Sequence, residues 1–129
     1  MADYEGAGII LTSEDGYVLI VKDIKTGKWS FPKGTKEECD ESPIITAVRE
    51  CSEEIGLYNY KDYQLVAEPP FVSFNRYYYH ANINKGAERR ITLQDEEITD
   101  YRWIKPNKSC SYWRELNVGV RQYMKTACT

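Results

Sequence analysis

The chain has no long apolar run and no excess of positive charge. A membrane-spanning helix needs roughly 18 or more apolar residues in a row, and the sequence contains no such run. Lys and Arg number 17 against 20 Asp and Glu, which gives a formal net charge of −3. This balance disfavours a protein that coats nucleic acid or an anionic membrane. It remains compatible with a small phosphorylated ligand held in a local site.

Cysteine and histidine are also scarce. The chain has four cysteines without a CxxC pair and a single histidine, which disfavours a zinc site. The first five residues, Met-Ala-Asp-Tyr-Glu, lack the basic start of a signal peptide. We therefore expect an intracellular, cytoplasmic protein with reduced thiols and no membrane partner.

The composition that remains is that of one folded domain. The 129 residues contain no repeat, linker or low-complexity tract, so we expect a single domain over residues 1–129. Hydrophobic residues make up 42% and aromatic residues 13%, which excludes a disordered chain. The 11 tyrosines favour a β-rich fold.

Residue patterns predict strands interrupted by two helices. Alternating or continuous apolar stretches bounded by turn residues predict strands, and helical spacing of apolar residues with a proline start and a glycine end predicts helices. The expected strands are Gly6–Thr12, Tyr17–Lys22, Tyr63–Ala67, Phe71–Ile83 and Ile98–Ile104. The first expected helix has Ser42 as its N-cap, starts at Pro43 and ends before Gly56, and the second runs from Tyr112 to about Ala127. This order predicts an α/β (α+β) fold in which helices flank a mixed β-sheet.

The first helix carries an unusual cluster of acids. At about 100° per residue, Glu50, Glu53 and Glu54 share one face, separate from an apolar stripe. Like charges at this spacing, in a last turn that prefers cations, destabilise a helix. Such a face is either a solvated acidic surface or a site for a hard divalent cation such as Mg²⁺, which prefers carboxylate oxygens.

The segment around this helix resembles the signature of the Nudix hydrolase family. Glu41 is followed by seven residues and then by Arg-Glu-Cys-Ser-Glu-Glu-Ile-Gly-Leu, residues 49–57. The family pattern has five residues between its glycine and the first glutamate, whereas Gly34 and Glu41 are separated by six. Cys51 stands where the family has a bulky aliphatic residue. The box therefore spans Gly34 to Leu57 with one inserted residue before Glu41.

The resemblance implies a role for each matching position. It implies a mixed sheet between helices, a site for Mg²⁺ (or Mn²⁺), and a water that attacks phosphorus. Metal ligands would be Glu50, Glu53, Glu54, the Lys33 backbone carbonyl and Glu97, with Glu96 as the alternative to Glu97. Catalytic residues would be Glu53, Glu54, Glu97 and Arg49. Glu41 would pair with Arg49, and Gly34, Glu41 and Gly56 would support the site.

The sequence indicates the family more specifically than it indicates the substrate. The run Trp-Ser-Phe-Pro-Lys-Gly, residues 29–34, is similar to members that hydrolyse dinucleoside polyphosphates of the diadenosine tetraphosphate type, mRNA caps or diphosphoinositol polyphosphates. We expect a pyrophosphohydrolase of the first kind, with a cap or RNA 5′-end hydrolase, a diphosphoinositol polyphosphate phosphohydrolase and a non-hydrolytic nucleotide sensor as alternatives. Expected substrate contacts are Lys33, Phe74, Arg76, Tyr77 and Tyr79; for the aromatic rings, core packing is the competing interpretation. Whether the chain is a monomer or a homodimer stays open.

Overall fold

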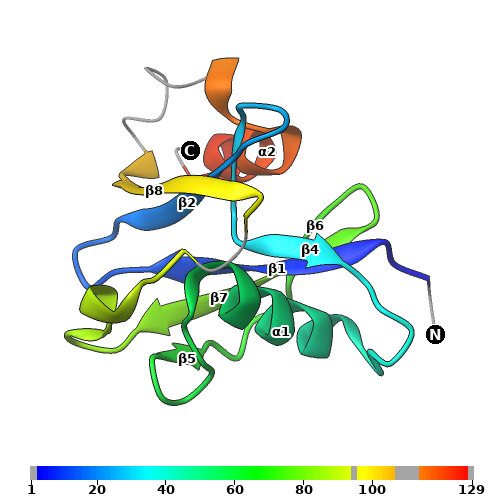
Figure 1. Cartoon of the computed structure of the whole chain (residues 1–129), viewed down its shortest axis with the longest axis horizontal. Helices are drawn as coiled ribbons and strands as arrows, with labels where there is room; N and C mark the ends of the chain where they lie inside the picture. The colour runs from blue at the N-terminus through cyan, green and yellow to red at the C-terminus, as the bar shows by residue number, and fades with distance from the viewer. Residues whose placement is uncertain (1–2, 94–95, 107–113, 128–129) are drawn as a thin grey trace.

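The computed structural model describes residues 3–93, 96–106 and 114–127. Within these residues, eight strands, two α-helices and the 3₁₀ helix η1 follow one another in sequence (Figure 1). In order they are β1 Gly6–Thr12, β2 Val18–Asp23, β3 Trp29–Ser30, β4 Lys33–Thr35, α1 Pro43–Ile55, β5 Tyr63–Leu65, β6 Phe71–Ser73, β7 Arg76–Ile83, η1 Ala87–Arg90, β8 Ile98–Ile104 and α2 Val118–Ala127.

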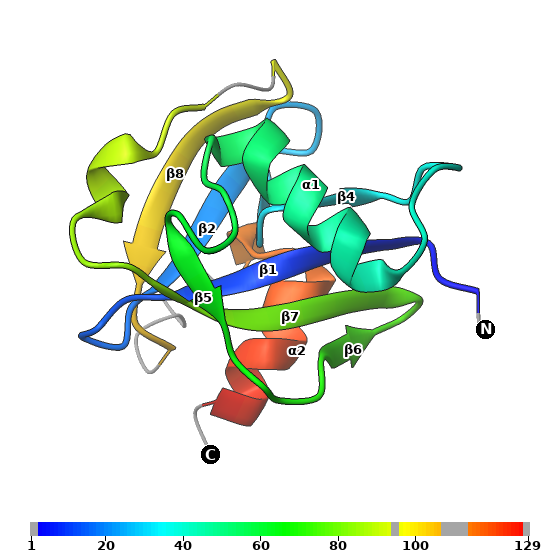
Figure 2. The same ribbon diagram turned by 90° about the horizontal axis from the view of Figure 1, so that it is seen from below.

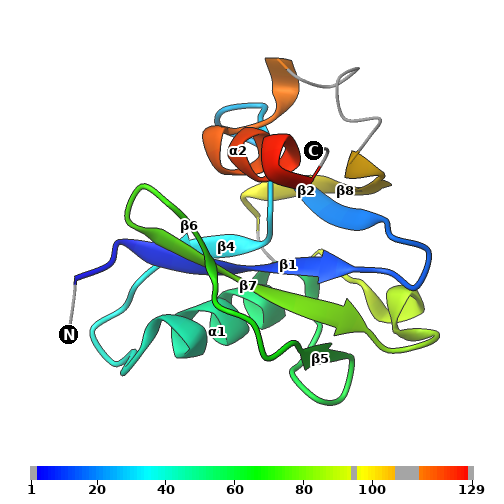
Figure 3. The same cartoon turned by 180° about the vertical axis from the view of Figure 1, so that it is seen from behind.

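The strands form one mixed sheet between the two helices. Its main path is β3-β2-β1-β7-β5, with β4 on β1, β6 on β7 and β8 on β2. The β1–β7 pair is parallel, whereas the other pairs are antiparallel. Figure 1 shows α1 below the strands and α2 above them, and Figure 3 shows the same layers from behind. The expected α+β fold with a sheet between helices is thereby confirmed.

Each face of the sheet buries its own hydrophobic cluster. Alternate residues of β1 point to opposite faces, so Ile9 and Leu11 pack with Ala47 and Cys51 of α1. Ile10 instead packs with Val120 of α2 and its neighbours. Figure 2 shows α1 lying beside β4. Because α1 is held on the sheet by this apolar stripe, its acidic side is turned away from the core and shares a cavity with residues of β4 and the start of β8.

Most predicted elements are present, with shifted limits. β1 and β8 have the expected bounds, and α1 starts at Pro43 and ends before Gly56, whose φ of +73° suits a glycine. The expected strand Phe71–Ile83 is divided by a turn at Phe74, where φ is +51°. The second helix starts later than predicted, at Val118, and positions 112 and 113 lie outside the described residues.

The short strands β3 and β4 were not predicted, since two or three residues carry too little periodicity to detect. The described cysteines, Cys39 and Cys51, are free thiols. Among the described residues, the helices are too short and too polar to cross a lipid bilayer.

Candidate active site

A polar cavity of about 440 Å³ lies between α1, β4 and the start of β8. Its walls are formed mainly by charged side chains. The lining residues are Asp23, Ser30, Lys33, Gly34, Thr35, Lys36, Glu37, Glu50, Glu53, Glu54, Arg76, Glu97 and Ile98. The three helix glutamates, Lys33, Arg76 and Glu97, named from the sequence, thus line one cavity.

The helix glutamates are unequally exposed. Glu50 and Glu54 are 9% and 8% exposed, whereas Glu53 lies at the open side. The backbone N–H of Lys33 donates a 3.0 Å hydrogen bond to Glu54 Oε1. This bond joins β4 to α1 and fixes the carboxylate against the strand. Two carboxylates that face a cavity at such low exposure carry a desolvation cost, which a bound cation would offset.

Gly34 provides the space that the Glu50 carboxylate occupies. A Cβ atom built at position 34 would overlap the carboxyl group of Glu50. Any larger residue would therefore push the acidic helix away from β4. The carboxylate oxygens collected here are the ligands that Mg²⁺ and similar hard cations prefer, so the residues fit such an ion. Within the described residues they do not already form a closed cluster of three or more ligating side chains.

Replacing Gly34 with alanine should therefore damage the site. The added methyl group cannot fit without moving Glu50, so we expect a loss of about 1–3 kcal/mol of stability and weaker Mg²⁺ binding. Chemical denaturation and calorimetric Mg²⁺ titration of the variant measure both. A G34A protein with unchanged stability and Mg²⁺ affinity would contradict this account of the glycine.

Arg49 lies among several acids on the side of α1. Its Nη1 atom is 3.2 Å from Glu53, 3.3 Å from Glu37 and 3.5 Å from Glu50. Its Nη2 atom is 2.7 Å from Asp40 and also donates to the Thr35 carbonyl at 3.2 Å. The hydrogen bonds that Arg49 donates to Asp40 and, with smaller effect, to Glu53 raise the pKa of Arg49 above its ordinary value. Arg49 therefore joins the loop to the acidic helix and is not among the residues that line the cavity.

The partner of Arg49 is Asp40, and the predicted pairing with Glu41 is wrong. Asp40 accepts hydrogen bonds from Arg49 Nε at 3.2 Å and Nη2 at 2.7 Å, a forked arrangement. It also accepts bonds from the Glu37 N–H and the Thr46 hydroxyl, both at 2.8 Å. Glu41 is exposed.

The inserted residue is consequently placed elsewhere in the box. Gly34 and Asp40 are separated by five residues, as the family pattern requires of its glycine and first carboxylate. The extra residue lies between Asp40 and Arg49, before α1 begins at Pro43. Counting back from Arg49 hid this alternative, and counting forward from Gly34 would have found it.

Asp40 is held in its charged form. Its side chain is 2% exposed, but the hydrogen bonds from Arg49, with those from Glu37 and Thr46, lower its pKa far below the ordinary value of 3.8. These bonds outweigh the burial, which acts in the opposite direction. The pair therefore stays ionised across the physiological range.

Two cations, Lys33 and Arg76, line the cavity together with the glutamates. Burial, together with the nearby charge of Arg76, lowers the pKa of Lys33 below its ordinary value, although Glu54 and Asp23 act against this. In the described part of the chain, neither Lys33 nor Arg76 has a carboxylate within ion-pair distance. Neighbouring cations that share a cavity without an acidic partner attract an anion.

Glu97 lines the same cavity at the start of β8. It is exposed and forms a 3.5 Å ion pair with Lys25. Glu96 precedes it in the turn and is not among the lining residues. The geometry therefore favours Glu97 over Glu96 as the acid from outside the box.

The predicted aromatic contacts lie away from this cavity. Tyr77 and Tyr79 pack against the cluster under α1, and the ring of Tyr77 contacts that of Tyr4. Phe74 is 70% exposed at the β6–β7 turn. None of the three is among the cavity's lining residues, whereas Arg76 is. For the two tyrosines, the competing interpretation of core packing describes their position.

Sequence reasoning missed several lining residues. Asp23 lies outside the motifs, and Ser30 and Glu37 stand at motif positions to which no role was assigned. They reach the cavity through the pairing of β2 with β3 and β8 and through the loop after β4. Their participation depends on contacts between distant segments, which no local pattern encodes. Lys33 was expected to act through its carbonyl, and the structure shows in addition its N–H bound to Glu54.

Comparison with known proteins adds to this geometry. A sequence model of the NUDIX domain matches residues 4–122. An RNA pyrophosphohydrolase of Stenotrophomonas maltophilia is 30% identical over 91 residues, which cover 70% of this chain and 42% of that protein. Another, from Pseudomonas fluorescens, is 42% identical over 60 residues, covering 46% of this chain and 36% of that protein. The chain thus matches less than half the length of these curated relatives.

Solved structures share the fold at low identity. An Ap4A hydrolase of C. elegans, in a binary complex, has a TM-score of 0.76 and 16% identity, covering 95% of this chain and 98% of that chain. A MutT protein from Methanosarcina mazei has a TM-score of 0.65 and 20% identity, covering 95% and 91%. At these identities the likeness shows the arrangement of strands and helices alone.

Proposed function

The chain belongs to the Nudix family, and from this premise we propose that it is a Mg²⁺-dependent pyrophosphohydrolase of a dinucleoside polyphosphate. The observation that carries the proposal is that three helix glutamates and two cations line the same cavity. Acids that bind a metal and bases that bind phosphate are the two parts that such hydrolysis needs. Mn²⁺ would fit the same carboxylates.

In this proposal each residue of the site has a separate role. Glu50, Glu53 and Glu54 would hold the divalent cation, which, when bound, neutralises phosphate charge and lowers the pKa of a water. Glu54 or Glu53 would orient that water, and Glu97 would accept its proton. The Lys33 N–H fixes the Glu54 carboxylate, and Arg49 fixes Glu53. Lys33 and Arg76 would bind phosphate oxygens beyond the bond that breaks.

The paired cations support a polyphosphate rather than a single phosphodiester. Lys33 can approach one phosphoryl group as a point charge, while the planar Arg76 guanidinium can bind two oxygens of the next. The C. elegans Ap4A hydrolase with a similar fold is consistent with such a substrate.

A second candidate is hydrolysis at the 5′ end of RNA. The curated relatives are named RNA pyrophosphohydrolases, and a 5′-triphosphate would place the same phosphate chain in the cavity. The net charge of −3 offers little for a long RNA strand, so we rank this substrate second.

A substrate panel tests both candidates. Diadenosine tetraphosphate, 5′-triphosphorylated RNA, capped RNA and a diphosphoinositol polyphosphate are incubated at equal concentration with the protein and Mg²⁺, and kcat/KM is compared. We expect the dinucleoside polyphosphate to give the highest value. A higher value for triphosphorylated or capped RNA would favour the RNA assignment, and tight binding without cleavage of any substrate would favour a sensor.

Replacing Arg76 with glutamine should weaken substrate binding selectively. Loss of a charged hydrogen bond to a phosphate corresponds to about a tenfold rise in KM, while kcat changes little because Arg76 would bind phosphate oxygens beyond the bond that breaks. Steady-state kinetics measures the split. Arg89→Gln is the matched control, since Arg89 is exposed on η1 and does not line the cavity. Equal KM values for R76Q and R89Q would contradict this role.

A further inference from the structure

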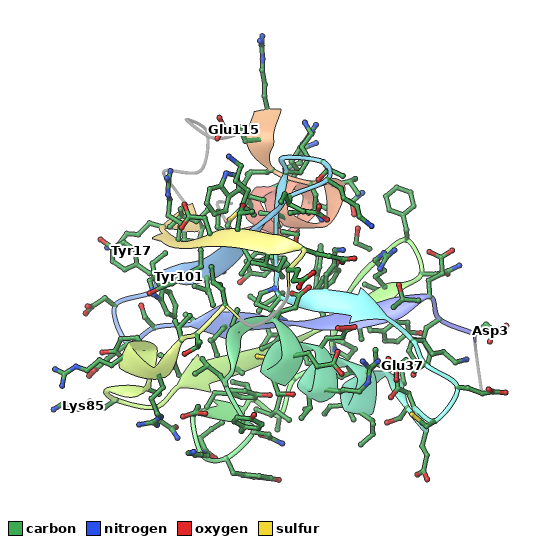
Figure 4. The ribbon with its side chains drawn as sticks, viewed as in Figure 1. Asp3, Tyr17, Glu37, Lys85, Tyr101 and Glu115 are labelled. Atoms are coloured by element: carbon green, nitrogen blue, oxygen red, sulfur yellow. The ribbon has the colours of Figure 1, made fainter. Side chains whose placement is uncertain are left out.

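A second cavity of about 310 Å³ lies at the opposite end of the sheet from the acidic site. Its lining residues are Ser13, Asp15, Tyr17, Ile83, Glu88 and Trp103. In Figure 4, Tyr17 lies at one end of the molecule and Glu37, a lining residue of the catalytic cavity, toward the other. The strand β8 contributes Ile98 to the first cavity and Trp103 to the second, a spacing of five residues or roughly 17 Å.

Two apolar side chains, Ile83 and Trp103, line this second cavity. Trp103 and Ile83 are partly buried and pack against the cluster under α1. Tyr17 stands at the rim, where the Lys105 ammonium lies 5.1 Å from its ring centroid. Lys105 is not a lining residue of the cavity, so its ammonium group contacts the Tyr17 ring from outside the cavity. Aromatic walls around a volume of this size are typical of sites for flat, small organic ligands.

Two carboxylates complete the cavity. Asp15 comes from the β1–β2 turn and Glu88 from η1. Among the described residues, neither side chain has a hydrogen-bond or ion-pair partner. An ionised carboxylate only accepts hydrogen bonds. The cavity therefore combines stacking surfaces with acceptors that need a donor-rich edge.

We propose that this cavity binds the guanine base of a nucleotide. Guanine presents N1–H and the N2 amino group side by side, so one carboxylate can accept both while the ring stacks on Tyr17 or Trp103. Adenine presents the unprotonated N1 beside its amino group, and a carboxylate would repel that lone pair. The acidic rim thus selects guanine over adenine. This binding goes beyond the proposed hydrolysis and does not require a bound metal.

The test measures the equilibrium binding of GMP, IMP and AMP by calorimetry, with EDTA present to remove divalent metal ions. We expect GMP to bind at least tenfold more tightly than AMP, and IMP, which lacks the amino group, to fall between them. The double variant D15N/E88Q should lower the GMP affinity by about 10- to 100-fold. Both side chains are exposed, so the fold, checked by circular dichroism, should be retained.

Matched controls separate this site from the catalytic cavity. Glu14→Gln removes the neighbouring acid, which does not line the cavity, and should leave the GMP affinity unchanged. R76Q alters the other cavity and should also leave it unchanged. Equal affinity for GMP and AMP, an unchanged GMP affinity in D15N/E88Q, or a loss of GMP binding in R76Q alone would overturn the proposal. Since no step requires hydrolysis, an inactive enzyme would leave the result interpretable.

Discussion

Replacing Glu54 with glutamine should abolish most Mg²⁺-dependent turnover and leave the fold intact. Glu54 is nearly buried at the cavity wall, and glutamine can still accept the Lys33 N–H through its own side-chain oxygen. The structural bond to β4 therefore survives, while the negative charge that would hold a cation and orient water is lost. We expect kcat to fall by roughly 10²- to 10⁴-fold. Steady-state kinetics on the preferred substrate of the panel measures it.

The control for this experiment is Glu41→Gln. Glu41 carries the same charge, belongs to the same sequence motif and is exposed at the start of the helix. Its removal should change kcat less than twofold if the acids act through the cavity rather than through overall charge. Thermal denaturation of both variants shows whether the fold is retained. Wild-type turnover in E54Q would overturn both the metal site and the proposed hydrolysis.

Replacing Asp40 with alanine should cause the largest loss of stability in the box. The buried carboxylate neutralises Arg49 and accepts hydrogen bonds from Glu37 and Thr46. Removing one partner of a buried ion pair leaves the other uncompensated, so we expect the free energy of unfolding to fall by about 3 kcal/mol. Urea denaturation measures it. Glu41→Ala is the matched control and should change the free energy by less than about 0.5 kcal/mol; the reverse order would restore the pairing predicted from the sequence.

The Asp40–Arg49 pair should also make the free energy of unfolding depend on pH. The pKa of Asp40 is lower in the folded protein than its ordinary value of 3.8. The carboxylate therefore contributes its full stabilisation above that value, and the contribution is lost as pH falls through the folded pKa. The free energy of unfolding of the wild type should fall more steeply than that of Asp40→Asn between about pH 5 and pH 2. Parallel slopes would show that Asp40 is not the acid that responds.

The acidic helix illustrates how far local sequence reaches. The start at Pro43, the end before Gly56, the apolar stripe and the shared face of Glu50, Glu53 and Glu54 all follow from residues within one helix. Each depends on helical periodicity and terminal residue preferences, which act over a few positions. The expected strands β1 and β8 were likewise detectable, because each has enough residues to show a pattern.

The partner of Arg49 shows where local reasoning stops. Two adjacent acids, Asp40 and Glu41, compete for one guanidinium, and their spacing from Arg49 alone favours the wrong one. The outcome is decided by the turn that buries Asp40 beneath Thr46, whose hydroxyl also meets the Tyr4 hydroxyl at 2.8 Å across 42 residues of chain. No pattern confined to the loop contains that contact. The same holds for Tyr77 and Tyr79 of β7, because the assembly of the sheet with α1 decides that they pack against the core.

The sequence by itself predicted a mixed fold of strands and helices and a shared carboxylate face on the first helix, because periodicity and motif spacing are properties of neighbouring residues. The tertiary structure alone decided which residues share a cavity. The sheet brings Lys33 of β4 and Arg76 of β7 to the same side through their common neighbour β1. It also places Trp103 and Tyr17 together at the far end. Charge complementarity across a cavity depends on strand pairing, and strand pairing joins residues that are distant in the chain.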